Sequence, residues 1–419
     1  MKRPGKHRVT RKQAGSRGGI GLALAGGGPL GAVYEIGAIR ALDEALEGLD
    51  FETLDSYVGV SAGAFVAACL ANGITPTQLV RMLFRHEPGE IPFTPETFFT
   101  PAYGEIGRRA MMLPGLATGS LWKALRQPGP QGLGAGLAHL ARALPVGYFD
   151  NEPIRRYVAA LLGNNGRTDD FRQLGRRLTI VAADLEAGTP VLFGEEGWTD
   201  VPISRAVQAS TAVPGLYLPV NVDDRLCVDG ALLKTMHASV PLAHGAGLVL
   251  CINPIVPVDT RSAVESGAMR RGELVHRGLP AVLSQSVRMG LASRMDTGLA
   301  SYALRYPDAD VVLLEPAQDE YDLFFANVFS FRSREAIADL AYEATRRDLS
   351  RRRGELAPVL ARHGVRLREE VLDDEERTLW TSVGLRAPRR AGYGSATHRL
   401  GRTITRLEHT VRWRRSGAA

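Results

Sequence analysis

Two strand–turn–helix patterns within the first 72 residues restrict the fold more than any other feature of the chain. Residues 20–25 (IGLALA) are apolar and run into three glycines, after which apolar residues recur every three or four positions to about residue 47. A second apolar run at residues 56–60 (SYVGV) leads into an alanine-rich segment at 62–72. This order is typical of a right-handed β-α-β unit, whose parallel strands have their carboxyl ends at one edge.

Three further apolar runs predict additional strands, at residues 177–183, 247–253 and 310–315. Helical or irregular segments connect them. We therefore expect an α/β fold with three layers (α/β/α) and a mainly parallel central sheet whose faces are covered by helices. Near the end of the chain, Ile337, Leu340, Ala341 and Ala344 form a helical pattern. We expect this helix to end at the charged run 346–353.

Residues 84–148 differ in composition and predict a helical cap inserted into this fold. The segment is rich in proline and glycine, with scattered aromatic and methionine side chains. Ordinary packing explains any one of these side chains, but together they are candidates for an acyl-chain pocket or a membrane-facing surface. They are Phe93, Phe98, Phe99, Tyr103, Met111, Met112 and Trp122.

The charge of the chain is concentrated at its ends. Residues 1–17 carry a net charge of +7 and residues 386–419 one of +8, whereas residues 18–385 carry −9. Two interpretations fit: the ends are disordered, solubilising extensions, or they attach the protein to anionic lipid head groups. Nucleic acid is not an expected partner, because no aromatic stacking motif or base-reading helix accompanies the basic residues.

Cysteine usage and the apolar runs argue against several other classes. Cys69, Cys227 and Cys251 are scattered without paired spacing, so we expect neither disulfides nor a zinc site, and a reducing compartment is the default. The first residues lack the apolar stretch of a secretory signal. Residues 56–80 are uncharged, but polar and helix-breaking residues from Asn72 onward interrupt them, so a membrane span is rejected. We expect a cytoplasmic protein with peripheral contact at a membrane.

Gly59, Ser61 and Gly63 fit the pattern G-x-S-x-G, a turn that exposes a serine hydroxyl between a strand and a helix. Glycines are needed there because side chains would clash. The motif alone is weak, but a β-branched strand precedes it and a helix of small residues follows. This context favours Ser61 as a nucleophile, and the helix amino terminus stabilises negative charge that develops nearby.

The second motif is the glycine loop Gly26-Gly27-Gly28-Pro29-Leu30-Gly31. One interpretation is the phosphate-binding loop of a nucleotide-binding protein, although neither a convincing G-x-G-x-x-G with an acidic strand end nor a G-x-x-x-x-G-K is present. The other is an oxyanion hole, in which each N–H donor contributes about 3 kcal/mol. Because Pro29 has no N–H, the donors would be Gly27, Gly28 or Leu30.

These two motifs, the stretch 209–215 (ASTAVPG) and Asp229-Gly230-Ala231 occur in an order that resembles the patatin-like phospholipase family. The resemblance covers roughly residues 20–255. It includes the segments 150–153 (DNEP) and 183–188 (ADLEAG), which are similar to structural landmarks of that fold. The ordered set is far more specific than any single motif.

The resemblance implies a serine hydrolase of lipid esters that works through an acyl-enzyme, without cofactor or metal. Ser61 would be the nucleophile and Asp229 the base that accepts its proton without a histidine, with Gly230 and Ala231 supporting Asp229. The oxyanion hole would lie in the loop formed by Gly26, Gly27, Gly28, Leu30 and Gly31. One departure is Leu30, since family members often carry arginine or lysine at this position.

Two alternatives stay open at this point. A histidine-containing triad would use His237 or His244, the nearest histidines downstream of Asp229. A catalytically inactive lipid-binding or scaffold protein of the same fold would retain the motifs without turnover. Neither the lipid head group nor the oligomeric state is indicated by the residues.

The same features predict four segments of the chain. Residues 1–17 would be a basic, disordered tail, and residues 18–260 the catalytic domain with its inserted cap. Residues 261–355 would form a carboxyl-terminal α/β extension that packs on the catalytic domain. Residues 356–419 would be a charged, basic tail, partly helical or disordered.

Overall fold

The computed structural model describes residues 18–85, 97–126, 130–265, 269–318, 320–321, 323 and 333–387. Their central element is an eight-stranded sheet with the order β11-β10-β1-β3-β5-β9-β8, in which β6 pairs with β5. The first five strands of this order run parallel to one another. The bounds are β1 Ile20–Leu24, β3 Ser56–Val60, β5 Arg177–Asp184, β6 Pro190–Phe193, β8 Val220–Val222, β9 Arg225–Asp229, β10 Leu248–Ile252 and β11 Asp310–Leu314.

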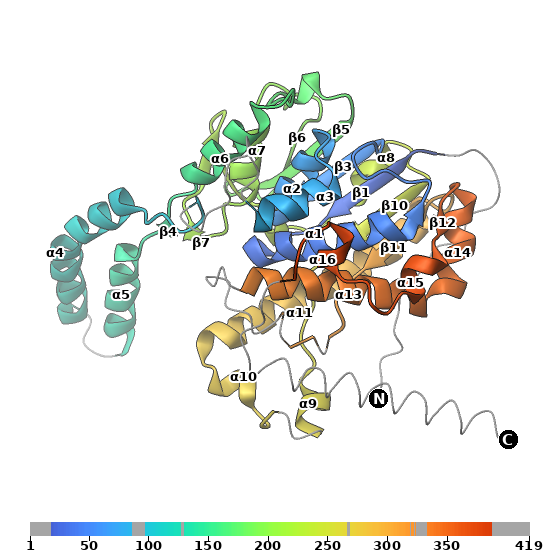
Figure 1. The fold of residues 1–419 in the computed structure, drawn as a ribbon. Coiled ribbons are helices and arrows are strands. Elements are labelled where there is room, and N and C mark those ends of the chain that lie inside the picture. The colour runs from blue at the N-terminus through green and yellow to red at the C-terminus, as the bar shows by residue number, and fades with distance from the viewer. Residues whose placement is uncertain are drawn as a thin grey trace. The chain divides into compact units, whose positions relative to one another are not determined.

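Each of the five strands predicted from apolar runs is confirmed. They are the five parallel strands, and β1 lies between β3 and β10 at the middle of this group (Figure 1). Helix α1 (Gly28–Ala45) follows β1, and helix α2 (Ala62–Ala71) follows β3. The carboxyl ends of β1 and β3 therefore lie side by side, with the glycine loop and Ser61 directly beyond them.

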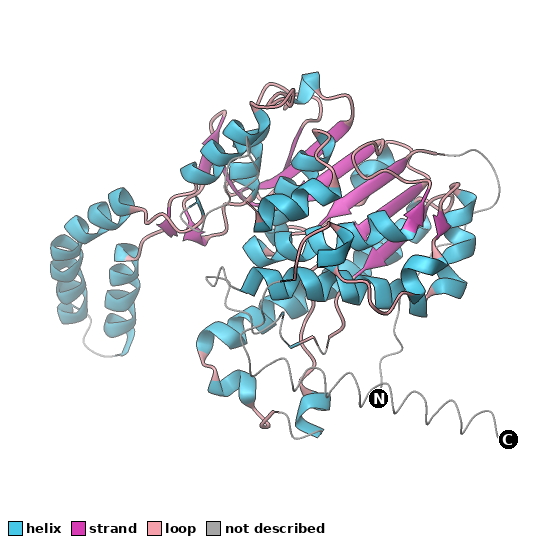
Figure 2. Ribbon diagram, in the orientation of Figure 1, coloured by secondary structure: helices cyan, strands magenta, loops and turns pink. Residues whose placement is uncertain are grey.

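Helices cover both faces of the sheet, which confirms the three-layer α/β/α prediction (Figure 2). Ala23 and Val58 face one side and pack with residues of α8 (Ser239–Ala243) and α11 (Leu279–Arg305). The opposite side is closed by α2, which contacts β1, β3 and β5 and lies against α1. Helix α13 (Arg334–Arg351) packs along α1 in the same layer.

Strand β5 has two antiparallel partners that the apolar pattern did not predict. Strand β6 pairs with residues 180–183 along one edge of β5. Along the other edge, β3 pairs as far as Val181 and β9 takes over at Ala182. Strands β3 and β9 therefore approach the same point from opposite directions, and the residues at their carboxyl ends meet there.

The region predicted as a cap is helical where it is described. Helices α4 (Tyr103–Arg126) and α5 (Pro130–Leu140) contact each other, and the short strand β4 (Gly147–Phe149) follows them. Tyr103, Met111, Met112 and Trp122 are exposed. Phe93 lies outside the described residues.

The expected end of the last long helix at residue 346 is wrong, because α13 continues to Arg351. Arg346 and Arg352 are buried within the charged run, at 8% and 6% exposure. Arg346 donates to main-chain carbonyls, among them those of Asp374 at 2.6 Å and Arg377 at 3.0 Å. Arg352 donates to the carbonyl of Leu313 at 3.0 Å. Charge does not end the helix here, because these guanidinium groups find acceptors inside the protein.

The described residues after 260 form helices and two strands, β11 and β12, of which β12 (Arg366–Leu367) pairs with β2 (Leu46–Glu47). Strand β11 is an edge strand of the central sheet, so residues after 260 contribute to that sheet. By its internal contacts the chain divides into Met1–Leu379 and Trp380–Ala419. The predicted domain boundaries stay predictions, and the predicted tail 1–17 and residues 388–419 lie outside the described residues. None of the helices that the structure describes combines the length and apolar character needed to cross a membrane.

The remaining helices and strands have the following bounds: β2 Leu46–Glu47, α3 Pro76–Phe84, α6 Glu152–Leu162, α7 Ile203–Ser210, β7 Gly215–Tyr217, α9 Arg261–Glu265, α10 Glu273–His276, α14 Arg353–Arg362, β12 Arg366–Leu367, α15 Glu369–Asp373 and α16 Leu379–Ser382.

Candidate active site

Ser61 occupies a sharp turn between β3 and α2. Its backbone has φ 54° and ψ −121°, a conformation that non-glycine residues rarely adopt. Such strain persists only where the surroundings enforce it, and it is common at sites of chemistry. The side chain stands at the amino terminus of α2, where the helix dipole stabilises negative charge.

Gly59 and Gly63 allow this turn by close packing of backbone. A Cβ at Gly59 would lie 2.6 Å from the Cα of Ala64, in the first turn of α2. A Cβ at Gly63 would lie 2.7 Å from the carbonyl oxygen of Ala25 at the end of β1. Both distances are shorter than real contacts, so α2 can start this close to the sheet only with glycine at these positions.

Asp229 meets Ser61 at the junction of β3 and β9. Val60 pairs with Val181 and Asp229 pairs with Ala182, the next residue of β5. Ser61 and Asp229 are each only 3% exposed, and the Ser61 side chain lies close enough to the Asp229 carboxylate to lower its pKa. Two residues that are 168 positions apart in the chain thus come into contact.

The environment of Asp229 makes its carboxylate more basic than usual. Burial raises its pKa from 3.8 to about 6, and the nearby Ser61 side chain and the Ala231 N–H offset part of this effect. The Ala231 N–H donates to Asp229 Oδ1 at 2.8 Å. A Cβ at Gly230 would overlap the Val181 carbonyl oxygen, so the chain after Asp229 needs glycine to pass β5.

Ser210 connects the backbone of Ser61 to β5. The Ser61 N–H donates to Ser210 Oγ at 2.8 Å, and Ser210 Oγ donates to the Val181 carbonyl at 2.6 Å. Ser210 is fully buried at the end of α7. Two residues later, the Ala212 carbonyl accepts the Asp229 N–H at 2.9 Å. The segment 209–215 therefore fixes the main chain of both Ser61 and Asp229.

The glycine loop lies directly against Ser61. A Cβ at Gly26 would come within 3.2 Å of the Ser61 Cβ and 3.8 Å of its Oγ. The Gly26 N–H donates to the Thr235 carbonyl at 3.4 Å and the Gly31 N–H to the Gly27 carbonyl at 3.0 Å. Among the described residues, the N–H groups of Gly27, Gly28 and Leu30 have no protein acceptor.

Gly27 and Gly28 set the shape of this loop. A Cβ at Gly27 would lie 2.7 Å from the Cα of Gly31 and 2.8 Å from the ring of Pro254. Gly28 begins α1 with φ +62°, which favours glycine. Free N–H groups at the amino terminus of a helix bind oxyanions well.

An apolar cavity of about 60 Å³ opens beside Ser61. Gly28, Pro29 and Ala32 line it from α1, and Phe98 lines it from the segment before α4. The rest of the lining comes from Ser61, α2, α6, α7 and the segment around β7. Its hydrophobic wall suits a hydrocarbon chain next to the serine. The lining residues on that side are Phe65, Phe98, Ile154, Tyr157, Val158, Val207, Thr211, Val213, Leu216 and Tyr217.

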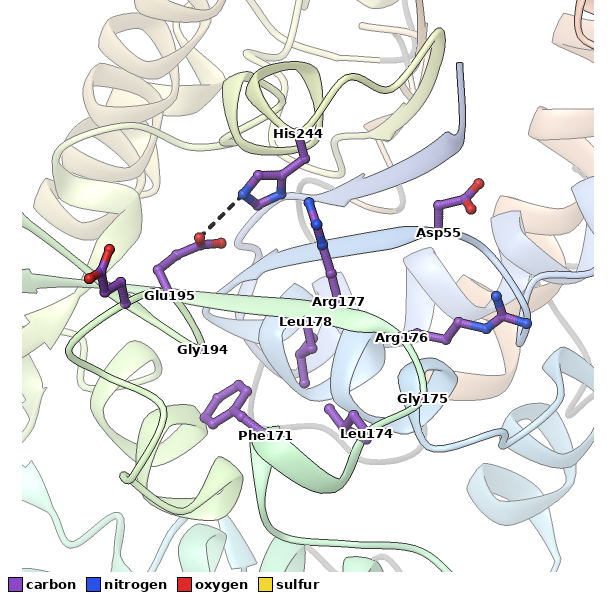
Figure 3. Close-up of a pocket in the computed structure, with 11 residues that line it drawn as sticks. Asp55, Phe171, Leu174, Gly175, Arg176, Arg177, Leu178, Gly194, Glu195 and His244 are labelled. Carbon is purple, nitrogen blue, oxygen red and sulfur yellow. Dashed lines mark hydrogen bonds and ion pairs between the residues drawn. The ribbon is translucent and has the colours of Figure 1, made fainter. Parts of the chain in front are cut away.

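A larger cavity of about 610 Å³ lies at the other end of the strands (Figure 3). Asp55 precedes β3 and Arg177 begins β5, so the length of β3, about 17 Å, separates this cavity from Ser61. Arg176 and Arg177 extend in different directions there, and acidic Glu195 lines the same space (Figure 3). This cavity is the larger of the two, but Ser61, the residue expected from the sequence to be the nucleophile, lines the smaller one.

Neither histidine considered for a triad contacts Ser61 or Asp229 through a hydrogen bond in the described residues. His244 Nε2 lies 3.2 Å from Glu195 Oε2 in the larger, polar cavity (Figure 3). His237 is buried, which lowers its pKa to about 3, and its Nε2 has no partner among the described residues. The described residues also contain no group of three or more His, Cys, Asp or Glu that could hold a metal ion.

Residues 22–242 match the family model of patatin-like phospholipases. An uncharacterized NTE family protein of Mycobacterium tuberculosis (strain ATCC 25618 / H37Rv) is 25% identical over 245 residues, which cover 58% of this chain and 31% of the relative. A second NTE family protein of the same organism is 40% identical over 78 residues, 19% of each chain. The chain thus spans about a third of the length of the first of these relatives.

Solved structures of low identity are also similar. VipD from Legionella pneumophila has a TM-score of 0.36 and 16% identity, and the match covers 80% of this chain and 67% of that chain. The ExoU–SpcU complex of Pseudomonas aeruginosa has a TM-score of 0.24 and 19% identity, with 86% and 69% covered. The family model covers more than half of the 419 residues. The chain therefore belongs to the patatin-like phospholipase family, a family of lipid acyl hydrolases.

Proposed function

We propose that this protein hydrolyses carboxylic esters of lipids, in the manner of a phospholipase A or a lysophospholipase, with Ser61 and Asp229 as a catalytic dyad. The observation that carries the proposal is that the Ser61 side chain lies beside the buried Asp229 carboxylate and lowers its pKa. Both residues, and the glycine loop beside them, lie within residues 18–260, which we propose as the catalytic part of the chain.

In the proposed reaction, Asp229 accepts the Ser61 proton as Ser61 Oγ forms a bond to the ester carbonyl carbon. The tetrahedral intermediate collapses, the bond to the alcohol oxygen breaks, and the alcohol leaves with a proton returned by Asp229. Water then attacks the acyl carbon and loses a proton to Asp229. The bond between the acyl carbon and Ser61 Oγ breaks, Asp229 returns the proton to Ser61 Oγ, and the carboxylic acid leaves. A pKa near 6 supports this role, because the carboxylate is ionised at neutral pH yet more basic than an ordinary aspartate.

Free N–H groups near Ser61 support an oxyanion hole in the glycine loop. In our proposal Gly27, Gly28 and Leu30 supply the donors, while Gly26 and Gly31 keep the loop in shape because their N–H groups already bind protein carbonyls. Backbone donors do not require the basic side chain that family members often carry where this chain has Leu30. The apolar cavity would receive the acyl chain.

Labelling with a fluorophosphonate probe tests the nucleophile. We expect wild type to be labelled and Ser61→Ala not to be. Asp229→Asn should slow labelling by at least a hundredfold. Asp184→Asn is the matched control, because Asp184 is also a buried aspartate at the end of a sheet strand, with its carboxylate bound by backbone N–H groups and Arg225.

The same experiment distinguishes the competing function. A folded wild-type protein that binds lipid vesicles but is never labelled would favour an inactive lipid-binding protein. Labelling that survives Asp229→Asn and is lost in His237→Ala would favour a histidine-dependent mechanism. Product analysis by mass spectrometry, with mixed membrane lipids and with Ser61→Ala as the blank, would then identify the ester that is cleaved.

A further inference from the structure

Helices α10 and α11 expose a set of apolar side chains that the proposed reaction does not use. Val275 is 72% exposed, Leu279 69% and Leu283 54%. We call these residues, together with Val282, Val287 and Met289, the α10–α11 surface; the three additional residues are 38%, 57% and 58% exposed. Leu279, Leu283 and Val287 recur every four residues, so they lie along one face of α11.

The two halves of α11 differ in their surroundings. In the second half, Met295 and Tyr302 are buried in the core beneath the sheet, with Leu299 packed against it. The first half carries the α10–α11 surface instead. The second half thus fixes the helix to the protein, while the first half presents leucine, valine and methionine to the outside.

Positive charge flanks this apolar surface. Residues 274–295 contain no aspartate or glutamate, whereas residues 18–385 as a whole carry −9. Arg270 and Arg271 precede the surface and Arg294 follows it. Two arginines lie within the surface. Arg277 pairs with Glu273 of α10 at 3.2 Å. Arg288 donates to the Val256 carbonyl at 3.1 Å. The exposed residues between Leu279 and Met289 are otherwise serine and proline, apart from the apolar ones.

We propose that the α10–α11 surface docks on an anionic lipid bilayer. An apolar helix face with cationic residues at its ends lies in the plane of a bilayer, with its apolar side chains at the head-group boundary. Each arginine near an anionic surface strengthens binding by about fivefold. A second copy of the chain is a poorer occupant, because a two-fold dimer would pair the two apolar faces but bring the flanking arginines of the two copies toward each other.

The docking helix is connected to the candidate active site. Arg294 donates to the carbonyl of Leu232 at 2.8 Å, and Leu232 follows Asp229 by three residues. Leu232 is itself 47% exposed. Docking would therefore hold the turn after Asp229 near the bilayer. The binding itself does not rest on the proposed hydrolysis, and it is measured in a variant that cannot perform it.

Sedimentation with vesicles tests the proposal. The full chain with Ser61→Ala would be mixed with vesicles of phosphatidylcholine alone and of phosphatidylcholine with phosphatidylserine. We expect stronger binding to the anionic vesicles, and at least a tenfold loss on adding Leu279→Asp and Leu283→Asp. Leu304→Asp is the matched control: Leu304 is 84% exposed on the same helix but outside the surface, so its change should leave binding unaltered.

Unaltered binding by the Leu279→Asp/Leu283→Asp protein would overturn the proposal. So would a wild type that is dimeric without vesicles and becomes monomeric on these changes, since the surface would then join two copies. If the double variant fails to fold, Arg270→Glu with Arg271→Glu must weaken binding to anionic vesicles and not to neutral ones. The same substitutions, made in the protein that keeps Ser61, should leave hydrolysis of a short soluble ester unchanged. Loss of vesicle binding can therefore be told apart from a failure of the proposed hydrolysis.

Discussion

The Ser210 hydroxyl holds the main chain of Ser61: it accepts the Ser61 N–H at 2.8 Å and donates to the Val181 carbonyl at 2.6 Å. Val181 is the last residue of β5 that pairs with β3, and β9 takes over at the next residue. The Ser210 side chain therefore lies where the carboxyl ends of β3 and β9 meet beside β5. The strained turn at Ser61 depends on an acceptor at this point.

Ser210→Ala should lower both stability and turnover. The Ser61 N–H and the Val181 carbonyl would lose their hydrogen-bond partner, which should lower the free energy of unfolding by about 1–3 kcal/mol. Displacement of Ser61 should lower kcat by about tenfold to a hundredfold with little change in KM, because small shifts of reacting groups are costly. Ser204→Ala is the control. Ser204 lies on the same helix as Ser210, and its buried hydroxyl donates to Asp169 at 2.7 Å. This substitution should lower the Tm but not kcat.

The activity should depend on the ionisation of Asp229. Its pKa, raised to about 6 by burial, means that the carboxylate needed as a base is present above about pH 6 and protonated below. We expect kcat/KM on a soluble ester to fall about tenfold per pH unit below 6 and to be level above 7. A midpoint near pH 4 would contradict the environment described for Asp229.

Because the pKa of Asp229 is raised, the effect of Asp229→Asn on stability should depend on pH. The folded-state pKa is above the unfolded value of 3.8, so the folded state binds the extra proton between pH 4 and 6. The resulting stabilisation is complete below about pH 4 and is lost as the pH rises through 6. It amounts to about 3 kcal/mol. Between pH 4 and pH 7 wild type should therefore lose this stabilisation, whereas Asp229→Asn should not. Measured by denaturant unfolding, the free energy of unfolding of Asp229→Asn relative to wild type should increase by about 3 kcal/mol over this range.

Local patterns were sufficient to predict the parallel part of the sheet. The β1 and β3 units carry their signals within a few residues, as an apolar run, a glycine turn and a helix. The same is true of Gly59 in the G-x-S-x-G turn, which is required by contacts with Gly63 and Ala64, four and five positions away. Gly63 differs, because it is required by Leu24 and Ala25 at the end of β1. The other features depend on neighbours in the chain and can be recognised without knowing the fold.

The antiparallel strands and the role of Ser210 depend on distant partners. Strand β8 is only three residues long, and its hairpin to β9 turns at Asp223 and Asp224, both with positive φ, without the glycine that usually marks such a turn. Ser210 contacts Ser61 across 149 positions. Nothing near a serine at the end of a helix indicates such a partner, so only the folded chain identifies it.

The helix α13 shows a limit of a different kind. The charged run 346–353 was expected to end this helix, and arginines are rarely buried. Arg346 is nevertheless buried, because its guanidinium group donates hydrogen bonds to the carbonyls of Leu372, near the end of α15, and Asp374. These acceptors lie more than 25 residues away in the chain, and no periodicity within residues 346–353 indicates them.

The apolar cavity predicts a change in acyl preference. Val213 lines it next to Thr211 and Leu216. Val213→Phe should fill part of the space and lower kcat/KM for a long-chain ester by at least tenfold, while a short-chain ester loses less than twofold. The ratio of the two esters in one preparation serves as an internal control for folding. An unchanged ratio would mean that the acyl chain binds elsewhere.

Two glycines of the site should respond differently to the same substitution. A Cβ at Gly59 would lie 2.6 Å from the Cα of Ala64, and only a shift of α2 could relieve the clash, so Gly59→Ala should lower the free energy of unfolding by more than about 3 kcal/mol. A Cβ at Gly26 would lie 3.2 Å from the Cβ of Ser61, a contact that a shift of a few tenths of an ångström relieves. Gly26→Ala should keep its Tm within a few degrees yet lose at least tenfold in kcat, because the groups that must shift are Ala231, next to the proposed base, and Ser61, the proposed nucleophile. Equal losses of stability, or full activity of Gly26→Ala, would show that this loop does not border the reacting serine.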